Sequence, residues 1–362
     1  MFNRRGVLFA ILFCSIIVPT SGSVAQTGGV QAVDVRIVAD EAEAALAILS
    51  KRKAGQEVTE QDWQRLFSTE GYTRLKKREL ALDRSFEEAD FRTFMLSDAL
   101  ASRAAALEET LEKWRRADVS AAAGRALLYL PKGARIRAKI YPVIKPMENS
   151  FVFEVKTDPA IFLYLDPKMS REQFENTLAH ELHHIGYGGS CPPAEAEQEI
   201  AALSANARTV VRWLGAFGEG LAMLAAAGGP GVHPHASSNA EDRARWDRDL
   251  SNFNQDFRKV EKFFLDVLEN RMSEEESTKA GFSFFGVQGP WYTVGWKMAA
   301  VIEQGHGREK LIECICDQRR LLPVYNEAVR KHNSSSKEPL ALWSDAIIDA
   351  ISRPAARKQP AR

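Results

Sequence analysis

One helix-forming segment, residues 170–185, constrains this chain more than any other feature. Ser170 and Gln173 form a capping box, in which a hydroxyl and an amide three residues apart satisfy the first N–H groups of a helix. The predicted helix has a continuous apolar flank made of Phe174, Leu178, Leu182 and Ile185. Three of the seven histidines of the chain fall within five positions on this helix. Such a concentration indicates chemistry rather than packing.

The segment 180–184 reads His-Glu-Leu-His-His and contains the pattern H-E-x-x-H. Its spacing places His180 and His184 one turn apart on one face, so both imidazoles can reach one metal ion. Glu181 lies just around the helix, where its carboxylate can take a proton from a water bound to that ion. We therefore predict a Zn2+ site with His180 and His184 as ligands and Glu181 as the general base. His183 does not complete the pattern and is expected to support the site or line its rim.

A catalytic zinc site needs a third protein ligand and an open position. The metzincin pattern would require Gly at 187 and His at 190, but the sequence has Tyr187 and Ser190. Three glutamates follow in a polar run that is typical of a solvated helix start: Glu195, Glu197 and Glu199. These three are the weaker candidates for the third ligand.

Glu219 is the stronger candidate, because residues 217–224 otherwise lack charge. An unpaired carboxylate in such a run would be costly, and metal coordination removes that cost. The alternative is an ion pair with a buried arginine such as Arg212. Gly220 and Ala222 are expected to keep this helix thin, so that its backbone approaches the zinc helix closely.

These two motifs together resemble those of the gluzincin metallopeptidases, whose third ligand is a glutamate in an E-G-x-A type segment. Residues 63–72 (W-Q-R-L-F-S-T-E-G-Y) and 292–299 (Y-T-V-G-W-K-M-A) are similar to bacterial zinc-dependent peptidase families of unknown function. The resemblance implies a mixed upper subdomain that carries the zinc helix, a helical lower subdomain and a cleft between them. It also implies that an edge strand before the zinc helix binds the substrate backbone by strand addition.

Gluzincins usually add a side-chain donor for the oxyanion of the tetrahedral intermediate. Tyr292 is our candidate, because a phenol can donate to that oxygen; a core aromatic with a satisfied hydroxyl is the alternative. His306 is a rival donor. His233 and His235 resemble a metal pair, but the surrounding Gly- and Pro-rich loop indicates a solvated cleft rim.

The rest of the sequence predicts an α+β fold, mostly helical, with a small, partly antiparallel sheet beside the zinc helix. Residues 38–117 and those after 170 have helical character, and Gly- and Pro-rich loops are expected at 186–193 and 228–236. Apolar alternation or continuity predicts three short strands: 135–140, 151–155 and 160–165. We expect four regions: a signal peptide (1–25), an N-terminal helical region (26–130), a catalytic domain (131–352) and a flexible basic tail (353–362).

The first 25 residues have the pattern of a cleaved export signal. Arg4 and Arg5 precede an apolar run at 7–18 that is short for a membrane span, and Ser-Val-Ala at 23–25 fits a signal-peptidase site. The mature protein is expected to be periplasmic or secreted, without stable membrane insertion. Three cysteines then remain, so at most one internal disulfide forms, Cys191 pairing with Cys314 or Cys316 if any pairing occurs.

Charge is balanced, with 48 Lys and Arg against 48 Asp and Glu, which disfavours a dedicated nucleic-acid binder. The predicted function is an exported zinc metallopeptidase that acts on a peptide or protein substrate. Two alternatives stay open. One is a non-catalytic extracytoplasmic binding protein on the same fold, against which an intact Glu181 argues. The other is a zinc hydrolase of non-peptide amides.

Overall fold

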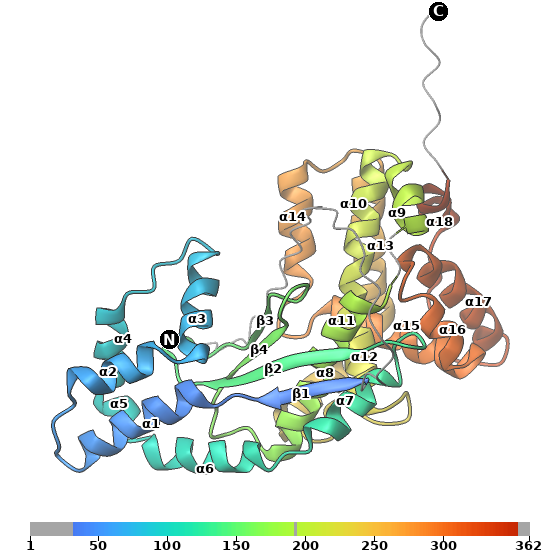
Figure 1. The fold of residues 1–362 in the computed structure, drawn as a ribbon. Helices are drawn as coiled ribbons and strands as arrows, with labels where there is room; N and C mark the ends of the chain where they lie inside the picture. Colours follow the sequence, from blue (N-terminus) through green and yellow to red (C-terminus); the bar gives the residue numbers. More distant parts are fainter. Residues whose placement is uncertain (1–31, 192–193, 354–362) are drawn as a thin grey trace, which may run out of the picture. The chain divides into compact units, whose positions relative to one another are not determined.

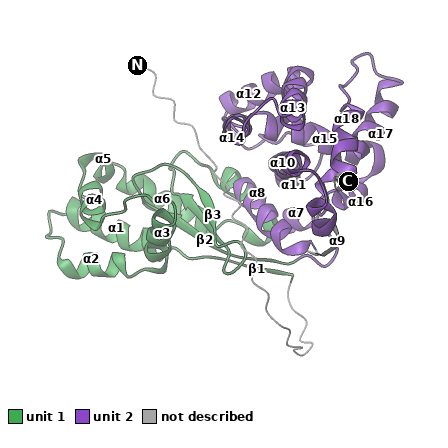
Figure 2. Ribbon diagram, turned by 90° about the horizontal axis from the view of Figure 1, so that it is seen from above, with its two compact units in different colours: residues 1–123, 135–175 green, residues 124–134, 176–362 purple. Residues whose placement is uncertain are grey.

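The computed structural model describes residues 32–191 and 194–353. The described chain forms two compact units, coloured separately in Figure 2. Unit 1 lies within residues 1–123 and 135–175, and unit 2 within 124–134 and 176–362. The predicted signal peptide lies outside the described residues, as does the predicted tail after Arg353. Because these units are defined by packing, unit 1 contains both the N-terminal helices and the sheet.

Unit 1 contains a four-stranded mixed sheet in the order β1-β2-β4-β3. Its strands are β1 (Val33–Ile37), β2 (Ile136–Val143), β3 (Phe151–Phe153) and β4 (Ala160–Tyr164). The pairs β1–β2 and β2–β4 are parallel, whereas β3–β4 is antiparallel. The three predicted strands are therefore present, and the α+β class is confirmed. The short strand β1, with alternating burial, was not predicted.

Two strands, β3 and β4, directly precede the zinc helix, and β3 is an edge strand, as the gluzincin resemblance implies; binding of a substrate to that edge stays a prediction. β4 pairs with β2 on one side and with β3 on the other. All five of its side chains are buried, as its almost wholly apolar sequence predicts. The edges of the sheet are β1 and β3.

Six helices follow β1 in unit 1, as the helical character of residues 38–117 predicts (Figure 1). They are α1 (Asp40–Lys53), α2 (Glu60–Phe67), α3 (Glu70–Leu80), α4 (Glu88–Met95), α5 (Asp98–Ala101) and α6 (Ala104–Arg115). α1 begins with acidic residues and ends with basic ones, which suits the helix dipole. Thr59 and Asp62 close a capping box at the start of α2. A further helix, α7 (Val119–Leu127), continues from unit 1 into unit 2.

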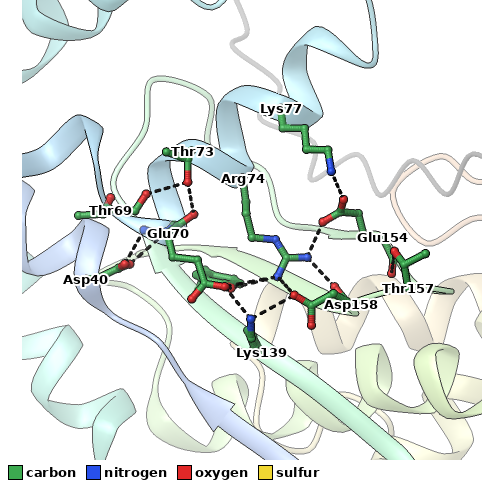
Figure 3. Close-up of polar contacts among 12 residues, drawn as sticks. Asp40, Thr69, Glu70, Thr73, Arg74, Lys77, Lys139, Glu154, Thr157 and Asp158 are labelled. Atoms are coloured by element: carbon green, nitrogen blue, oxygen red, sulfur yellow. Dashed lines mark hydrogen bonds and ion pairs between the residues drawn. The ribbon is translucent and has the colours of Figure 1, made fainter.

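A network of opposite charges ties α3 to the sheet in unit 1 (Figure 3). Arg74 donates to Glu154 at 2.7 Å and to Asp158 at 2.9 Å. Lys139 on β2 donates to Glu70 at 2.6 Å and to Asp158 at 3.1 Å. Each cation in this network thus faces carboxylates. The positive and negative charges of the network are paired with one another, so the network needs no further ion.

Unit 2 is helical and is built around α15 (Pro290–His306), which packs against α11, α13, α16 and α17. Its other elements are α8 (Arg171–Ser190, whose first turn lies in unit 1), α9 (Ala194–Ala201), α10 (Ala205–Leu214), η1 (Gly215–Phe217), α11 (Gly218–Ala227), α12 (Ala240–Ser251), α13 (Phe253–Leu268), α14 (Glu274–Ser283), α16 (Arg308–Glu313), η2 (Gln318–Arg320), α17 (Leu321–Asn333) and α18 (Asp345–Ser352). Large aromatic side chains fill its core, among them Phe217, Trp291 and Trp343.

α11 and α15 cross at two glycines, and this contact corrects a prediction about Gly220. A Cβ on Gly220 would lie 2.0 Å from the backbone nitrogen of Trp296, and one on Gly295 would lie 2.8 Å from the carbonyl oxygen of Phe217. Gly220 therefore allows α11 to approach α15, not the zinc helix. The segment 217–224 is apolar because it is enclosed by this packing.

The continuous segment Ala205–Ala227 is long and apolar enough to cross a membrane by length and composition. However, 72% of its most apolar window is buried inside the structure, which is the pattern of a core helix. The segment comprises α10, η1 and α11, and it carries Glu219 into the core of unit 2. Its apolar composition is explained by packing.

Candidate metal centre

The helix that carries the histidines, α8, begins as its sequence predicts. Ser170 N donates to Gln173 Oε1 at 2.8 Å, and Gln173 N donates to Ser170 Oγ at 3.2 Å, so the capping box is present. The helix runs to Ser190, whereas we expected a loop from residue 186. Side-chain contacts hold this glycine-rich end, because Gln318 hydrogen-bonds to the hydroxyl of Tyr187.

A disulfide also anchors the end of α8. Cys191, directly after the helix, is bonded to Cys316, and Cys314 stays a buried free thiol. This pairing is one of the two alternatives that the sequence left open. It ties the end of the histidine helix to the segment before η2.

Three of the predicted site residues meet in unit 2. His180 Nε2 lies 3.1 Å from Glu219 Oε2, and His184 Nε2 lies 3.3 Å from the same oxygen. The two imidazole nitrogens are 3.1 Å apart. Within the described residues, these three form the group of His, Cys, Asp or Glu side chains that could hold a metal ion. α8 supplies two of the atoms through its one-turn spacing, and α11 supplies the third.

The spacing of these three atoms fits a zinc ion. Zinc binds imidazole nitrogen at about 2.0–2.1 Å and carboxylate oxygen at about 2.0–2.2 Å, in tetrahedral geometry. Ligand atoms on such a tetrahedron are therefore about 3.3 Å apart. The observed separations of 3.1, 3.1 and 3.3 Å agree with this value. With three protein ligands, a fourth position is left for water or substrate.

Glu219 is only 2% exposed, and its described partners are the two imidazoles and the hydroxyl of Tyr292, which hydrogen-bonds to the carboxylate. Burial raises the pKa of its carboxyl, but interactions with His184 and His180 outweigh burial and hold the pKa well below its usual range. The ion pair with Arg212 that we considered does not form, because Arg212 is exposed on α10. The carboxylate is therefore charged and buried.

The glutamate side chains of the polar run that the structure describes, Glu197 and Glu199, lie outside this group. Glu197 and Glu199 are exposed, and Glu199 accepts a hydrogen bond from Arg319 at 2.6 Å. The side chain of Glu195 lies outside the described residues. Glu197 and Glu199 are thus exposed whereas Glu219 is buried, as the polar and apolar composition of their segments predicts.

The predicted base, Glu181, is buried next to the group. Its side chain is 2% exposed, and its Oε1 atom makes no hydrogen bond. Burial raises the pKa of this carboxyl, while His180 and His184 act in the opposite direction. An oxygen without a partner in a buried position is costly unless a ligand or water meets it.

Tyr292 lies in the first turn of α15 and faces the same group. Its ring is stacked on that of His180, with centroids 6.3 Å apart and an interplanar angle of 15°. Burial, followed by the charges of Glu219 and Glu181, raises the pKa of the phenol. The hydroxyl therefore keeps its proton and can act as a donor.

His183 and His306 lie apart from the three ligand atoms. His183 is buried rather than at a rim: its Nε2 atom lies 3.4 Å from the carbonyl oxygen of Tyr129, and burial lowers its pKa to about 3. His306 ends α15, about 21 Å along the helix from Tyr292. Its nearest acidic group is Glu327, at 4.0 Å. His306 is therefore not a rival donor at this site.

The His233–His235 pair does not form a metal group either. His233 pairs with Asp247 at 3.0 Å. His235 is 5% exposed, and its Nδ1 atom lies 2.9 Å from Ser238 Oγ. The expected solvated rim is wrong for His235, because the loop folds back on Trp246, whose ring centroid lies 5.2 Å away.

One feature near the group was missed from the sequence. Residues 281–289, the last residues of α14 and the loop before α15, read Gly-Phe-Ser-Phe-Phe-Gly-Val-Gln-Gly. The ring of Phe285 in this loop lies 6.5 Å from that of Tyr292. The sequence signal that could have identified this segment is a group of large apolar residues between glycines, without helical or strand periodicity.

Comparison with known proteins supports the metal assignment at the level of a family. The family described as "Putative zinc dependent peptidase (DUF5700)" matches residues 63–334. No curated protein and no solved structure matched the chain. The matched region covers more than half of the chain and includes His180, His184, Glu219 and Tyr292. The chain therefore belongs to this family.

Proposed function

We propose that this protein is an exported zinc metallopeptidase of the gluzincin type, with its site in unit 2. The observation that carries the proposal is the triangle of His180 Nε2, His184 Nε2 and Glu219 Oε2, whose sides are 3.1–3.3 Å. These residues would hold the ion. Bound there, Zn2+ would polarise the scissile carbonyl and make water more acidic.

Each neighbouring side chain then has a distinct task. Glu181 takes a proton from the attacking water on its carboxylate and returns it to the leaving amine. Its buried Oε1 atom, which has no hydrogen-bond partner, is available for that proton. Tyr292 donates its hydroxyl proton in a hydrogen bond to the developing oxyanion. The raised pKa of the phenol supports this role.

Export is supported by two independent features. The first 25 residues have the n-region, apolar run and small residues of a signal peptide. The Cys191–Cys316 disulfide in unit 2 suits an oxidising compartment. A peptide substrate is favoured over other amides by the family to which the chain belongs.

The test compares the zinc-loaded wild type with Glu181→Gln in a digest of a mixed peptide library, followed by mass spectrometry. We expect the wild type to cleave peptides and the variant to lose at least about 100-fold in rate, because a general base contributes that much or more. Zinc content should be equal in both. A wild type that binds zinc and cleaves no peptide, or a variant that retains full activity, would overturn the proposal.

A further inference from the structure

The segment 281–289, which comprises the last residues of α14 and the loop before α15, leaves large apolar side chains in solvent. Phe282 is 48% exposed and Val287 is 49% exposed, while Phe285 is half-buried. Full burial of such a side chain stabilises the folded state by about 1.5–3 kcal/mol, and these exposed side chains do not contribute that free energy. Single exposed apolar residues are common, but apolar side chains that are exposed together in one short segment indicate a binding site.

The exposure does not come from a loosely held backbone. Trp291 Nε1 donates to the carbonyl oxygen of Gly281 at 2.8 Å, and Gly289 N donates to that of Phe285 at 2.6 Å. Gln288 is held at φ +59°, a left-handed conformation that costs a non-glycine residue about 1 kcal/mol or more. Both ends of the loop are thus fixed. The apolar side chains are presented in a defined arrangement.

Ring contacts lead from this loop to the metal group within unit 2. The rings of Phe282 and Phe285 are 6.1 Å apart, and those of Phe285 and Tyr292 are 6.5 Å apart. Tyr292 in turn lies 6.3 Å from His180. An extended peptide advances about 3.3 Å per residue. Phe285 is therefore within reach of a side chain close to the bond being cleaved.

We propose that Phe282, Phe285 and Val287 bind a large apolar side chain of the peptide substrate, within a few residues of the scissile bond. This inference rests on the proposed function and names the substrate class that the site prefers. The size of the surface supports a single side chain as its occupant. A stable protein partner would need about 800 Å² on each side, far more than three side chains provide.

The experiment uses pairs of fluorogenic peptides that differ only by Leu or Ser, placed in turn at each of the two positions on either side of the cleaved bond. At one of these positions, we expect wild-type kcat/KM to be about 10- to 200-fold higher with Leu. In the double variant Phe282→Ser/Val287→Ser, this ratio should fall toward one. The control is Leu128→Ser, a residue of unit 2 that is 55% exposed; it should keep the wild-type ratio.

A binding measurement separates this inference from the proposed function. Fluorescence anisotropy of the same labelled peptides with zinc-loaded Glu181→Gln reports affinity without turnover. If no peptide is cleaved, the proposed function fails, and the affinity ratio of Leu over Ser still decides the inference. Equal values for Leu and Ser at every position would overturn it, as would a preference that survives the double variant. Val287→Ser alone serves if the double variant fails to fold.

Discussion

Each unit of the molecule holds one buried charged side chain within a cluster of ionisable groups, and the two clusters differ in how that buried charge is balanced. In unit 1, the Arg74 side chain is 9% exposed and meets Glu154 and Asp158 directly. In unit 2, Glu219 is 2% exposed and meets two imidazoles and the hydroxyl of Tyr292. The first cluster contains its own counter-charges. The second contains a full negative charge whose described partners are a neutral phenol and two imidazoles that are charged only if protonated.

This difference distinguishes a structural ion network from a metal site. A buried charge needs a partner, because desolvation costs several kcal/mol. Arg74 is paired with carboxylates from other elements of unit 1. For the cluster in unit 2, a divalent cation is the partner that imidazole and carboxylate donors both accept. The neighbouring Glu181, with an oxygen that makes no hydrogen bond, adds to that requirement.

The largest effect is expected for the metal cluster. Glu219→Ala should weaken zinc binding on the order of 1,000-fold, because zinc binding of about 10–16 kcal/mol is shared among few ligands. Glu199→Ala is the matched control and should bind zinc as the wild type does, since Glu199 is exposed and paired with Arg319. Titration of each apo protein with zinc against a competing chelator measures both. If Glu219→Ala binds zinc with wild-type affinity, the assignment of the unit 2 cluster as a metal site is wrong.

The opposite response is expected for the ion network. Arg74→Met should lower the free energy of unfolding by about 2 kcal/mol, because it removes hydrogen bonds from a buried cation to Glu154 and Asp158, which are partly exposed and keep their lysine partners. Zinc affinity should stay unchanged, since every predicted ligand lies in unit 2. Urea unfolding and zinc titration of the same variant test both statements. A loss of zinc affinity without a loss of stability would reverse the roles assigned to the two clusters.

Packing at the α11–α15 crossing should matter nearly as much. Gly220→Ala places a methyl group 2.0 Å from the backbone of Trp296, and overpacking of this kind costs about 2 kcal/mol. Zinc affinity should fall with it, because Glu219 is the adjacent residue. Gly124→Ala is the control: nothing lies within 4 Å of the added Cβ. Thermal unfolding that is equal in the two variants would contradict the close approach.

The smallest effect concerns Glu41 in unit 1, which is 0% exposed and accepts a hydrogen bond from Ile144 N at 2.9 Å. Burial raises its pKa to about 8. Between its unfolded value near 4.5 and this value, the folded state holds a proton that the unfolded state has lost, so stability falls as pH rises. From pH 5 to 6, the wild type should lose about 1.4 kcal/mol more than Glu41→Gln. Hydrogen exchange of the β2 amides measures this, and identical pH profiles would refute it.

Local patterns predicted the elements that carry the site. The capping box at Ser170 and the one-turn spacing of His180 and His184 depend only on residues within one helix, so the sequence was sufficient for both. Glu219 was predicted from the absence of neighbouring charge. Its proximity to the histidines in the structure agrees with that reasoning.

Features set by long-range packing were not predictable from these patterns. Strand order is decided by pairing across the chain, so the interior position of β4 could not be read from its apolar run. Gly220 was recognised as a point of close approach, but its neighbour, α15, follows 70 residues later in the chain. The burial of His235 and the placement of Phe285 beside Tyr292 depend in the same way on loops that fold back.

Zinc K-edge X-ray absorption on the full chain, loaded with one equivalent of zinc, tests the central claim most directly. The account predicts a first shell of light atoms at about 2.0–2.2 Å that includes scattering from two imidazoles. In Glu219→Ala, this shell should lose a ligand or the zinc should be lost altogether. A shell with sulfur at about 2.3 Å would assign the metal to cysteine instead. That result, or wild-type protein that retains no zinc, would contradict the account.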